Sequence, residues 1–411
     1  MLIEIHILQN HAPSNLNRDD SGSPKTATFG DVKRARISSQ CLKRSVRRSE
    51  LFSSHMGQHL ATRTRRLPEQ IKSRFAADPT LAPYAEVAAQ KASGFGTTEG
   101  KERPANPKTG EYETAQTILF TRADEDAVFE TLQAAATKSG SVAAFKNLKA
   151  AELQKEARQT GFRPLAVDVA LFGRMVTSEA FRDVEASAQV AHAISTNKVT
   201  PQFDYFTAVD DLQSSDTTME QDAGADIIGD VEFNSACYYK YFSIHPNALV
   251  DNLVGAEFRR EVPASERNTQ IELAALAVAE FLRAAVRVSP SGKQNSFAAH
   301  QLPYAILVEV RPHTLPVSYA NAFVEPASAR GQSLTRDSFA KLKTHVEAVT
   351  RKFDLESDAR FLLTEEDGEA FQIAGVSSIP SLNSLCQALQ NEVLKLQNGA
   401  VASALNGANH G

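Results

Sequence analysis

The stretch that decides most about this chain is residues 15–48, NLNRDDSGSPKTATFGDVKRARISSQCLKRSVRR. Its second half predicts a helix, because Ser38 or Ser39 can cap a first turn by accepting bonds from the free backbone N–H groups. Leu42 and Val46 are four residues apart, so they are expected to share one face and to pack on a core. The stretch therefore predicts an amphipathic helix that follows a polar segment.

The same stretch carries an unusual charge. Seven Lys or Arg lie between residues 33 and 48 with no acid among them, and Lys43 and Arg47, or Arg44 and Arg48, share helix faces. Residues 18–74 hold 14 Lys or Arg against 5 Asp or Glu, a local charge of +9 in a chain whose net charge is −5, so the remainder carries −14. Such concentrated charge repels itself and indicates a polyanionic partner, with phosphate the first candidate.

Composition bounds the protein class. The chain has 411 residues, 42% hydrophobic and 23% charged, which is typical of one large or two ordinary globular domains. The sequence predicts no membrane span and no signal peptide. Cys41, Cys237 and Cys386 are odd in number and far apart, so we expect no disulfide framework. This cysteine usage predicts a cytoplasmic location, where thiols stay reduced.

The hydrophobic pattern predicts an α+β sheet domain with excursions. Ile3, Ile5 and Ile7 alternate with polar residues, which predicts a first strand with one buried face. A polar loop is expected over 9–30, helical segments over 60–160, and an exposed break at 94–112. Further strands are expected at 165–175, 230–244 and 304–310, and helices at 176–193, 270–288, 335–352 and 381–397.

Residues 196–229 are polar, poorly periodic and long for a connection. Long unpatterned insertions tend to be functional or disordered. We also expect disorder after residue 398.

Several sequence blocks together resemble a known family. They are NHAPSNLNRDDSGSPKTATFG, RARISSQCLKRSVRR, ALFGRMVTS, AHAIST and DYFTAVDDL, in this order, with weaker similarity at GKQNSFAAH and LPVSYANAF. They resemble the repeated backbone subunit of the type I-E CRISPR surveillance complex Cascade, the CasC family, seventh of the Cas families. The strong blocks span about residues 2–245, and departures are expected at 97–155 and in the tail.

The resemblance implies an RRM-like (ferredoxin-like) palm, a helical fingers insertion and a protruding thumb. The implied palm is 1–50, 160–195 and 230–350, the fingers 51–159, the thumb 196–229, and the C-terminal helices with a flexible tail 351–411. Copies would stack head-to-tail along a CRISPR RNA, and each thumb would kink the guide, which is displayed for pairing with target DNA in antiviral defence.

The resemblance also implies partners. These are the CRISPR RNA, the target DNA strand through the guide heteroduplex, further copies of the chain, and other Cascade subunits: end-capping, large and small subunits and the repeat-processing endoribonuclease. The implied subunit is non-catalytic, with no cofactor, no bound metal and no membrane contact.

The candidate RNA-binding residues are polar or cationic side chains that contact phosphate and ribose without selecting a base. They are Asn17, Arg18, Lys25, Arg34, Arg36, Ser38, Ser39, Gln40, Lys43, Arg44, Arg47, Arg174, Lys293, Gln294 and Asn295. The apolar Met175 is a further candidate, which the resemblance implies would wedge against a base where the guide is kinked. The alternative for the helix is a solvated cationic face. The alternative for Met175 is a core methionine at a strand end, since a polarizable Met packs equally well on a base or in a core.

The candidate thumb wedge is Tyr205, Phe206, Thr207 and Val209. In the resembled family these positions lie at the tip that inserts between nucleotides, and an apolar wedge can unstack a base step without reading it. The alternative is that the aromatic pair only packs the thumb on a neighbouring palm.

Two other function classes stay open from the sequence. Asp19 and Asp20 could hold Mg²⁺ in a metal-dependent ribonuclease, as a loop Asp does in the type III relatives, although a turn or a salt bridge to Arg18 is favoured. A general RRM-type single-strand binder without a CRISPR role is the third hypothesis. The sequence contains no Gly-rich phosphate loop, no GxSxG motif and no HExxH motif. It therefore gives no support for an ATPase, a hydrolase or a zinc enzyme.

Overall fold

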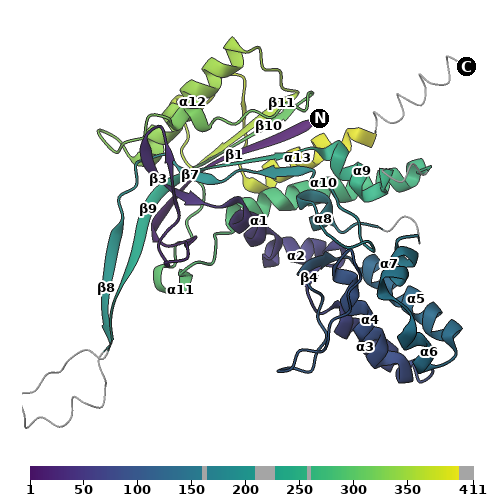
Figure 1. Ribbon diagram of the computed structural model, residues 1–411. Coiled ribbons are helices and arrows are strands. Elements are labelled where there is room, and N and C mark those ends of the chain that lie inside the picture. Colours follow the sequence, from purple (N-terminus) through teal and green to yellow (C-terminus); the bar gives the residue numbers. More distant parts are fainter. Residues whose placement is uncertain (160–163, 209–226, 257–260, 398–411) are drawn as a thin grey trace, which may run out of the picture. The chain divides into compact units, whose positions relative to one another are not determined.

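The computed structural model describes residues 1–159, 164–208, 227–256 and 261–397 (Figure 1). The chain forms two compact units. The first comprises Met1–Phe52, Val190–Ser243 and Ala279–Leu389, and the second comprises Ser53–Gln189, Ile244–Val278 and Gln390–Gly411.

The first unit is built on a mixed sheet. Its strands follow the order β12-β11-β10-β1-β9-β7-β3-β2, with β6 and β8 also paired to β9. The central pairs β10–β1 and β10–β11 are antiparallel, and β11–β12 is parallel. The strands are β1 Leu2–Ser14, β2 Thr26–Phe29, β3 Val32–Ile37, β6 Ala188–Val190, β7 Ala193–Ser195, β8 Gln202–Ala208, β9 Ile227–Ile244, β10 Ala305–Arg311, β11 Ala359–Thr364 and β12 Ser377–Ser378.

Helices accompany this sheet. They are α1 Ser39–Arg47, α11 Gln294–Phe297, α12 Leu334–Lys352, most of α13 Leu382–Leu394 and the last part of α10 Ala264–Arg287. The helix α2 Glu50–Met56 begins in this unit and ends in the second. The short helix η6 Ala320–Phe323 and α12 cover one sheet face, where Tyr239, Leu307 and Phe339 share a core. A mostly antiparallel sheet with helices packed on it confirms the α+β class and is consistent with an RRM-like palm.

The second unit is mainly helical. Its elements include α3 Leu67–Ala76, α4 Ala85–Ser93, α5 Arg122–Ser139, α6 Val142–Asn147, α7 Ala150–Gln159, α8 Val167–Phe172, α9 Pro246–Val254, and the strand pair β4 Thr62–Thr64 and β5 Ile118–Phe120. Phe75, Phe95, Leu132 and Phe145 are buried together in its core. This confirms helical segments over 60–160.

The contact-based units differ from the predicted division. Residues 164–189, 244–256 and 261–278 belong to the helical unit, whereas the predicted palm includes them. The functional division into palm, fingers, thumb and C-terminal region stays a prediction.

The first strand is longer and more buried than predicted. Ile3, Ile5 and Ile7 face one buried side, but Glu4 and His6 on the other face are also fully buried. The prediction of a single buried face is therefore wrong, because alternating polarity also occurs in a strand whose polar residues have buried partners.

The predicted loop over 9–30 is also corrected in part. β1 continues to Ser14, and β2 and β3 form an antiparallel hairpin joined at Gly30 and Asp31. Polar residues of this strand have distant partners: Gln9 Nε2 donates to the Gln301 carbonyl at 2.6 Å, and Lys240 Nζ donates to Gln9 Oε1 at 2.5 Å. These partners lie far away in the sequence. From its neighbours alone, the polar residues of this segment are therefore typical of a loop.

The predicted strand at 165–175 is helix α8, and the described structure of 176–193 is not the expected helix. Residues Val167 to Leu171 are all buried, so the segment has no alternation to identify a strand. Asp168 accepts a bond from the Ala61 backbone N at 2.8 Å, a partner that only the tertiary fold provides. Packing overrides β-propensity here.

Other predicted elements are confirmed. The predicted strands at 230–244 and 304–310 correspond to β9 and β10, and the predicted helices at 270–288, 335–352 and 381–397 correspond to α10, α12 and α13. No helix in the described part of the chain is long and apolar enough to cross a bilayer.

The predicted thumb begins as a two-stranded ribbon. β8 pairs antiparallel with the first part of β9, from Gln202↔Phe233 to Ala208↔Ile227, and Figure 1 shows these strands leaving the sheet together. We call this ribbon the thumb hairpin. The expected tail after residue 398 lies outside the described residues.

Candidate nucleic-acid interface

An open groove of about 840 Å³ lies where α1 meets two loops of the first unit. The first loop lines it with residues between 16 and 22, and the second loop with residues between 288 and 292. Arg18 of the first loop, Arg44 of α1 and Arg48, the C-cap of α1, line it, and all three are exposed. Asp19 and Asp20 also line it. The groove thus has a cationic helix along one wall, the arrangement that holds a phosphate backbone.

The helix α1 forms as predicted. Ser38 is the N-cap and its hydroxyl oxygen accepts from the Cys41 backbone N at 3.3 Å, while Leu42 and Val46 are buried. Its cationic faces differ: Arg44 and Arg48 line the groove, whereas Lys43 and Arg47 are half-buried and lie outside its lining. Arg48 was missed as a candidate residue, although its four-residue spacing from Arg44 was the signal for it.

Asn17 has a structural role that the sequence did not predict. Its Oδ1 accepts from the Ser38 backbone N at 2.9 Å, and its carbonyl accepts from the Lys25 backbone N at 2.8 Å. Asn17 therefore joins the groove loop to the start of α1. Gln40 and Lys25 are exposed and half-buried respectively.

Asp19 forms a turn, as the sequence favoured. Its Oδ1 accepts from the Ser21 backbone N at 2.9 Å, the Ser21 hydroxyl at 2.7 Å and the Ser23 backbone N at 3.1 Å. The bond from the Ser21 hydroxyl is the main reason that the pKa of Asp19 is below its ordinary value. This carboxylate oxygen is engaged in shaping the loop.

Gly292 lets the second loop approach the first. A Cβ at this position would lie 2.4 Å from the Leu16 carbonyl oxygen and 2.6 Å from that of Asn15. Because both obstacles are backbone atoms, no larger residue fits without moving a groove wall.

The predicted polar loop at Lys293, Gln294 and Asn295 begins the short helix α11. Gln294 is engaged within its own loop, where its Nε2 donates to the Pro290 carbonyl at 3.0 Å and its Oε1 accepts from the Ala299 backbone N at 2.8 Å. Lys293 is half-buried with a left-handed backbone, and Asn295 is exposed. The loop is held in shape by Gln294, so Lys293 and Asn295 are the better placed for a ligand.

Arg34 is corrected as an RNA-contacting candidate. Its side chain is fully buried. It donates to the carbonyls of Thr196 at 2.6 Å, Phe323 at 2.7 Å and Val324 at 3.1 Å, and also to those of Phe29 and Ser195. A guanidinium has five N–H donors in a fixed fork, so it can bind several loops at once.

Arg174 is corrected for the same reason. It is 7% exposed, its Nη1 donates to Asp124 Oδ2 at 2.5 Å, and its Nε donates to the Arg182 carbonyl at 3.1 Å. Met175 behaves oppositely: it is 91% exposed and follows the helix α8 rather than a strand. The alternative of a core methionine is therefore wrong.

The thumb hairpin exposes aromatic side chains. Phe203 is 63%, Tyr205 67% and Phe206 44% exposed, and the Phe206 ring lies over Gly229 on the paired strand. Phe203 was missed as a candidate, although its alternation with Tyr205 was a signal that they share a strand face. Thr207 lies on β8, and Val209 lies outside the described residues.

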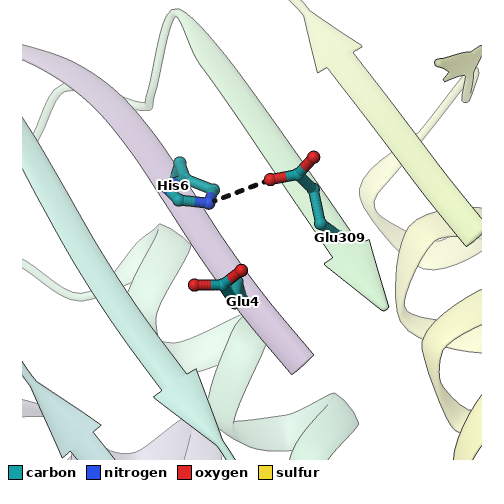
Figure 2. A group of neighbouring side chains, drawn as sticks. All are labelled: Glu4, His6 and Glu309. Carbon is teal, nitrogen blue, oxygen red and sulfur yellow. Dashed lines mark ion pairs between the residues drawn. The ribbon is translucent and has the colours of Figure 1, made fainter. Parts of the chain in front are cut away.

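A buried polar cluster lies elsewhere on the sheet, between β1 and β10 (Figure 2). Glu4 pairs with Glu309 across the strands, and His6 Nε2 lies 3.5 Å from Glu309 Oε2. Ligand-type atoms of these three residues lie within 4.8 Å of one another, close enough in principle to hold a metal ion.

Two guanidinium groups already neutralise this cluster. Arg311 donates from Nε to Glu4 and from Nη2 to Glu309 at 2.9 Å, and Arg360 Nε donates to Glu309 at 2.7 Å. Burial alone would raise the pKa of Glu309, but His6, Arg311 and Arg360 lower it to about 2. We interpret the cluster as an internal ion-pair network, because a cation would be repelled by both guanidinium groups.

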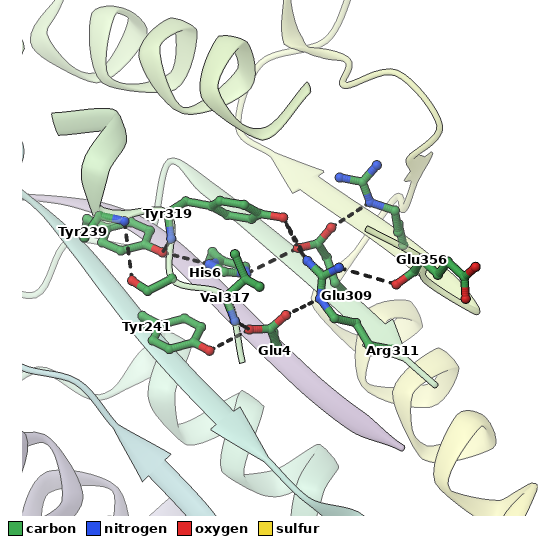
Figure 3. Close-up of polar contacts among 12 residues, drawn as sticks. Glu4, His6, Tyr239, Tyr241, Glu309, Arg311, Val317, Tyr319 and Glu356 are labelled. Atoms are coloured by element: carbon green, nitrogen blue, oxygen red, sulfur yellow. Dashed lines mark hydrogen bonds and ion pairs between the residues drawn. The ribbon is translucent and has the colours of Figure 1, made fainter. Parts of the chain in front are cut away.

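Tyrosines extend this network (Figure 3). Tyr241 donates to Glu4 at 2.5 Å, Tyr319 donates to Glu309 at 2.8 Å, and the Tyr239 hydroxyl lies 2.8 Å from His6 Nδ1. Alternating Glu4 and His6 gave no sequence signal for it, because the same pattern fits a strand that faces solvent.

Comparison with known proteins decides the family. The sequence profile of the CT1975-like proteins matches residues 3–388, nearly the whole chain. The chain belongs to the CT1975-like protein family. A search of curated proteins found no match.

Solved structures with the same fold agree with this family. A chain of a "CRISPR RNA-guided surveillance complex, pre-nicking" is 28% identical, with a TM-score of 0.76, over 96% of this chain and 100% of that one. A chain of a "CRISPR RNA-guided surveillance complex" is 23% identical, with a TM-score of 0.67, over 95% and 100%, and supports the fold alone. Family and fold together place this CT1975-like chain among Cascade-type CRISPR subunits.

Proposed function

We propose that this chain is the non-catalytic CRISPR RNA-binding backbone subunit of a type I-E Cascade complex. Copies polymerise head-to-tail along the guide and display it for pairing with target DNA. The observation that carries the proposal is the groove in which Arg18, Arg44 and Arg48 are exposed along walls held by backbone contacts. Charge without base-reading groups suits a protein that must accept any spacer.

The remaining surfaces have parts in the same proposal. Exposed Met175 packs on an unstacked base, and Tyr205 with Phe206, Thr207 and Val209 forms the wedge of the thumb. Because a head-to-tail contact is heterologous, RNA length and end-capping subunits set the copy number. The complex includes the large and small subunits and the repeat-processing endoribonuclease, acts in the cytoplasm, and needs no cofactor in this chain.

A matched pair of variants tests the groove. Arg44→Ala removes a lining cation, and Lys352→Ala removes an exposed cation of α12 outside the groove. With single-stranded RNAs of unrelated sequence, Arg44→Ala is expected to weaken binding equally for each. The slope of log affinity against log salt should fall by about 0.7 for one lost phosphate contact.

Two results would contradict this function. If the loss in Arg44→Ala depends strongly on RNA sequence, the groove reads bases. If Lys352→Ala causes the same loss, binding is nonspecific attraction over the whole surface.

A ribonuclease resembling the type III backbone subunits is the alternative, because Asp19 and Asp20 line the groove. The chain is co-expressed with a repeat–spacer RNA, the purified complex is given a complementary target RNA, and both RNAs are mapped with and without Mg²⁺. The scaffold predicts intact RNA with evenly spaced protected segments. Mg²⁺-dependent cuts at regular intervals in bound target RNA, lost in Asp20→Asn, would establish the nuclease instead.

A further inference from the structure

His192 lies just before β7, beside the N-terminus of α1. Its Nδ1 is 3.3 Å from the Ser39 backbone N and 3.3 Å from Arg36 Nη1. The side chain is exposed, so a ligand can reach it. Arg36 is held in place because its Nε donates to the Thr26 carbonyl at 3.2 Å.

Hydrogen-bond donors outnumber acceptors at this point. Both Ser39 N–H and Arg36 are directed at one ring nitrogen, which has a single lone pair. The two distances are long compared with the usual value of about 2.9 Å. Ser39 is the first residue of α1, so its N–H has no partner inside the helix. An anionic oxygen placed here would accept from both donors.

Partial burial and two neighbouring cations disfavour the protonated ring in the free protein. Partial desolvation, then the charges of Arg36 on β3 and Lys25 ahead of β2, lower the pKa of His192 below its ordinary value. In the described part of the chain, no carboxylate is among the groups that shift this pKa. A bound anion would therefore oppose both cations and raise it.

We propose that His192 is a further guide-contacting residue, which exchanges the bonds it accepts from Ser39 and Arg36 for a bond that it donates to an RNA phosphate. This inference rests on the proposed function. On binding, Nδ1 takes a proton from solvent and becomes a donor, and the Ser39 N–H and Arg36 turn to the phosphate oxygens. One proton enters the complex for each such site, so RNA binding is linked to pH.

The test compares the full-length protein with its His192→Gln variant. Gln can accept from Ser39 but does not titrate. Affinity for one single-stranded RNA is measured at fixed salt between about pH 5.5 and about pH 8, the range in which histidine titrates. Thermal unfolding of both proteins checks that the fold is kept, and His192→Asn is the second non-titrating variant.

In the wild type, affinity should rise as pH falls through the pKa of His192 in the complex. It should level off below the pKa of the free protein, with a slope of at most about tenfold per pH unit. Both variants should lose the part of the pH dependence of RNA affinity that comes from His192. Equal slopes in all three proteins would overturn the inference while leaving RNA binding intact. No RNA binding at any pH would overturn the proposed function itself.

Discussion

Arg34 and Arg44 belong to one basic segment and have opposite environments. Arg34 is fully buried and donates to backbone carbonyls of three separate segments, whereas Arg44 is exposed on the groove. In the sequence the two arginines carry the same charge and lie in the same basic segment. Their functions differ because only one of them has carbonyl groups within reach of its guanidinium.

This difference predicts different costs of substitution. Arg34→Lys keeps the charge but loses the planar fork, so several buried carbonyls lose their partner. The free energy of unfolding should fall by on the order of 3 kcal/mol. Arg44→Ala should change it by less than about 0.5 kcal/mol. Denaturant unfolding of both variants measures this, and an equally small change in both would show that the Arg34 bonds are dispensable.

At the scale of elements, the groove depends on how closely two loops approach each other. Gly292 has carbonyl oxygens where a Cβ would lie, whereas Gly57, in the other unit, has no atom within 4 Å of that position. The loop after α10 can therefore hold its place only with glycine at residue 292. The basic helix supplies charge, and this contact fixes the opposite wall.

Gly292→Ala is therefore expected to displace the groove wall. RNA affinity should fall by roughly tenfold, and the unfolding free energy should drop by about 1–3 kcal/mol, the usual cost of overpacking. Gly57→Ala is the matched control and should leave RNA affinity unchanged. The two measurements are filter binding and denaturant unfolding. Unchanged affinity in Gly292→Ala would mean that RNA does not use this wall.

For the whole molecule, polymerisation on a guide makes a quantitative prediction. Each copy should cover a fixed length of RNA, so a longer spacer should bind more copies in whole-number steps. Co-expression with spacers of three lengths, followed by native mass measurement, gives the copy number directly. A constant copy number would point to a closed oligomer, and a single copy would favour the general RNA binder.

Much of the local structure follows from sequence alone. Alternating apolar residues predicted β1, a run of residues with high β-propensity predicted β9, and the sequence also predicted β10, α10, α12 and α13. The sequence predicted Ser38 or Ser39 as the cap of α1, and the structure has Ser38 in that place. The concentration of Lys and Arg predicted a cationic surface around the helix. These signals are local, because helix caps, periodicity and charge density depend on neighbours in the chain.

Partners distant in sequence decided the rest. Burial of Arg34 and Arg174 removed them from the surface, and Asp168 joined a helix where strand propensity was high. The polar face of β1 is buried because Arg311 and several tyrosines come to meet Glu4 and His6. The sequence by itself thus determined which segments carry charge and which segments have a helical or an extended periodicity. The tertiary structure decided which of the charged side chains are exposed to a ligand, because only folding brings each group to its partner.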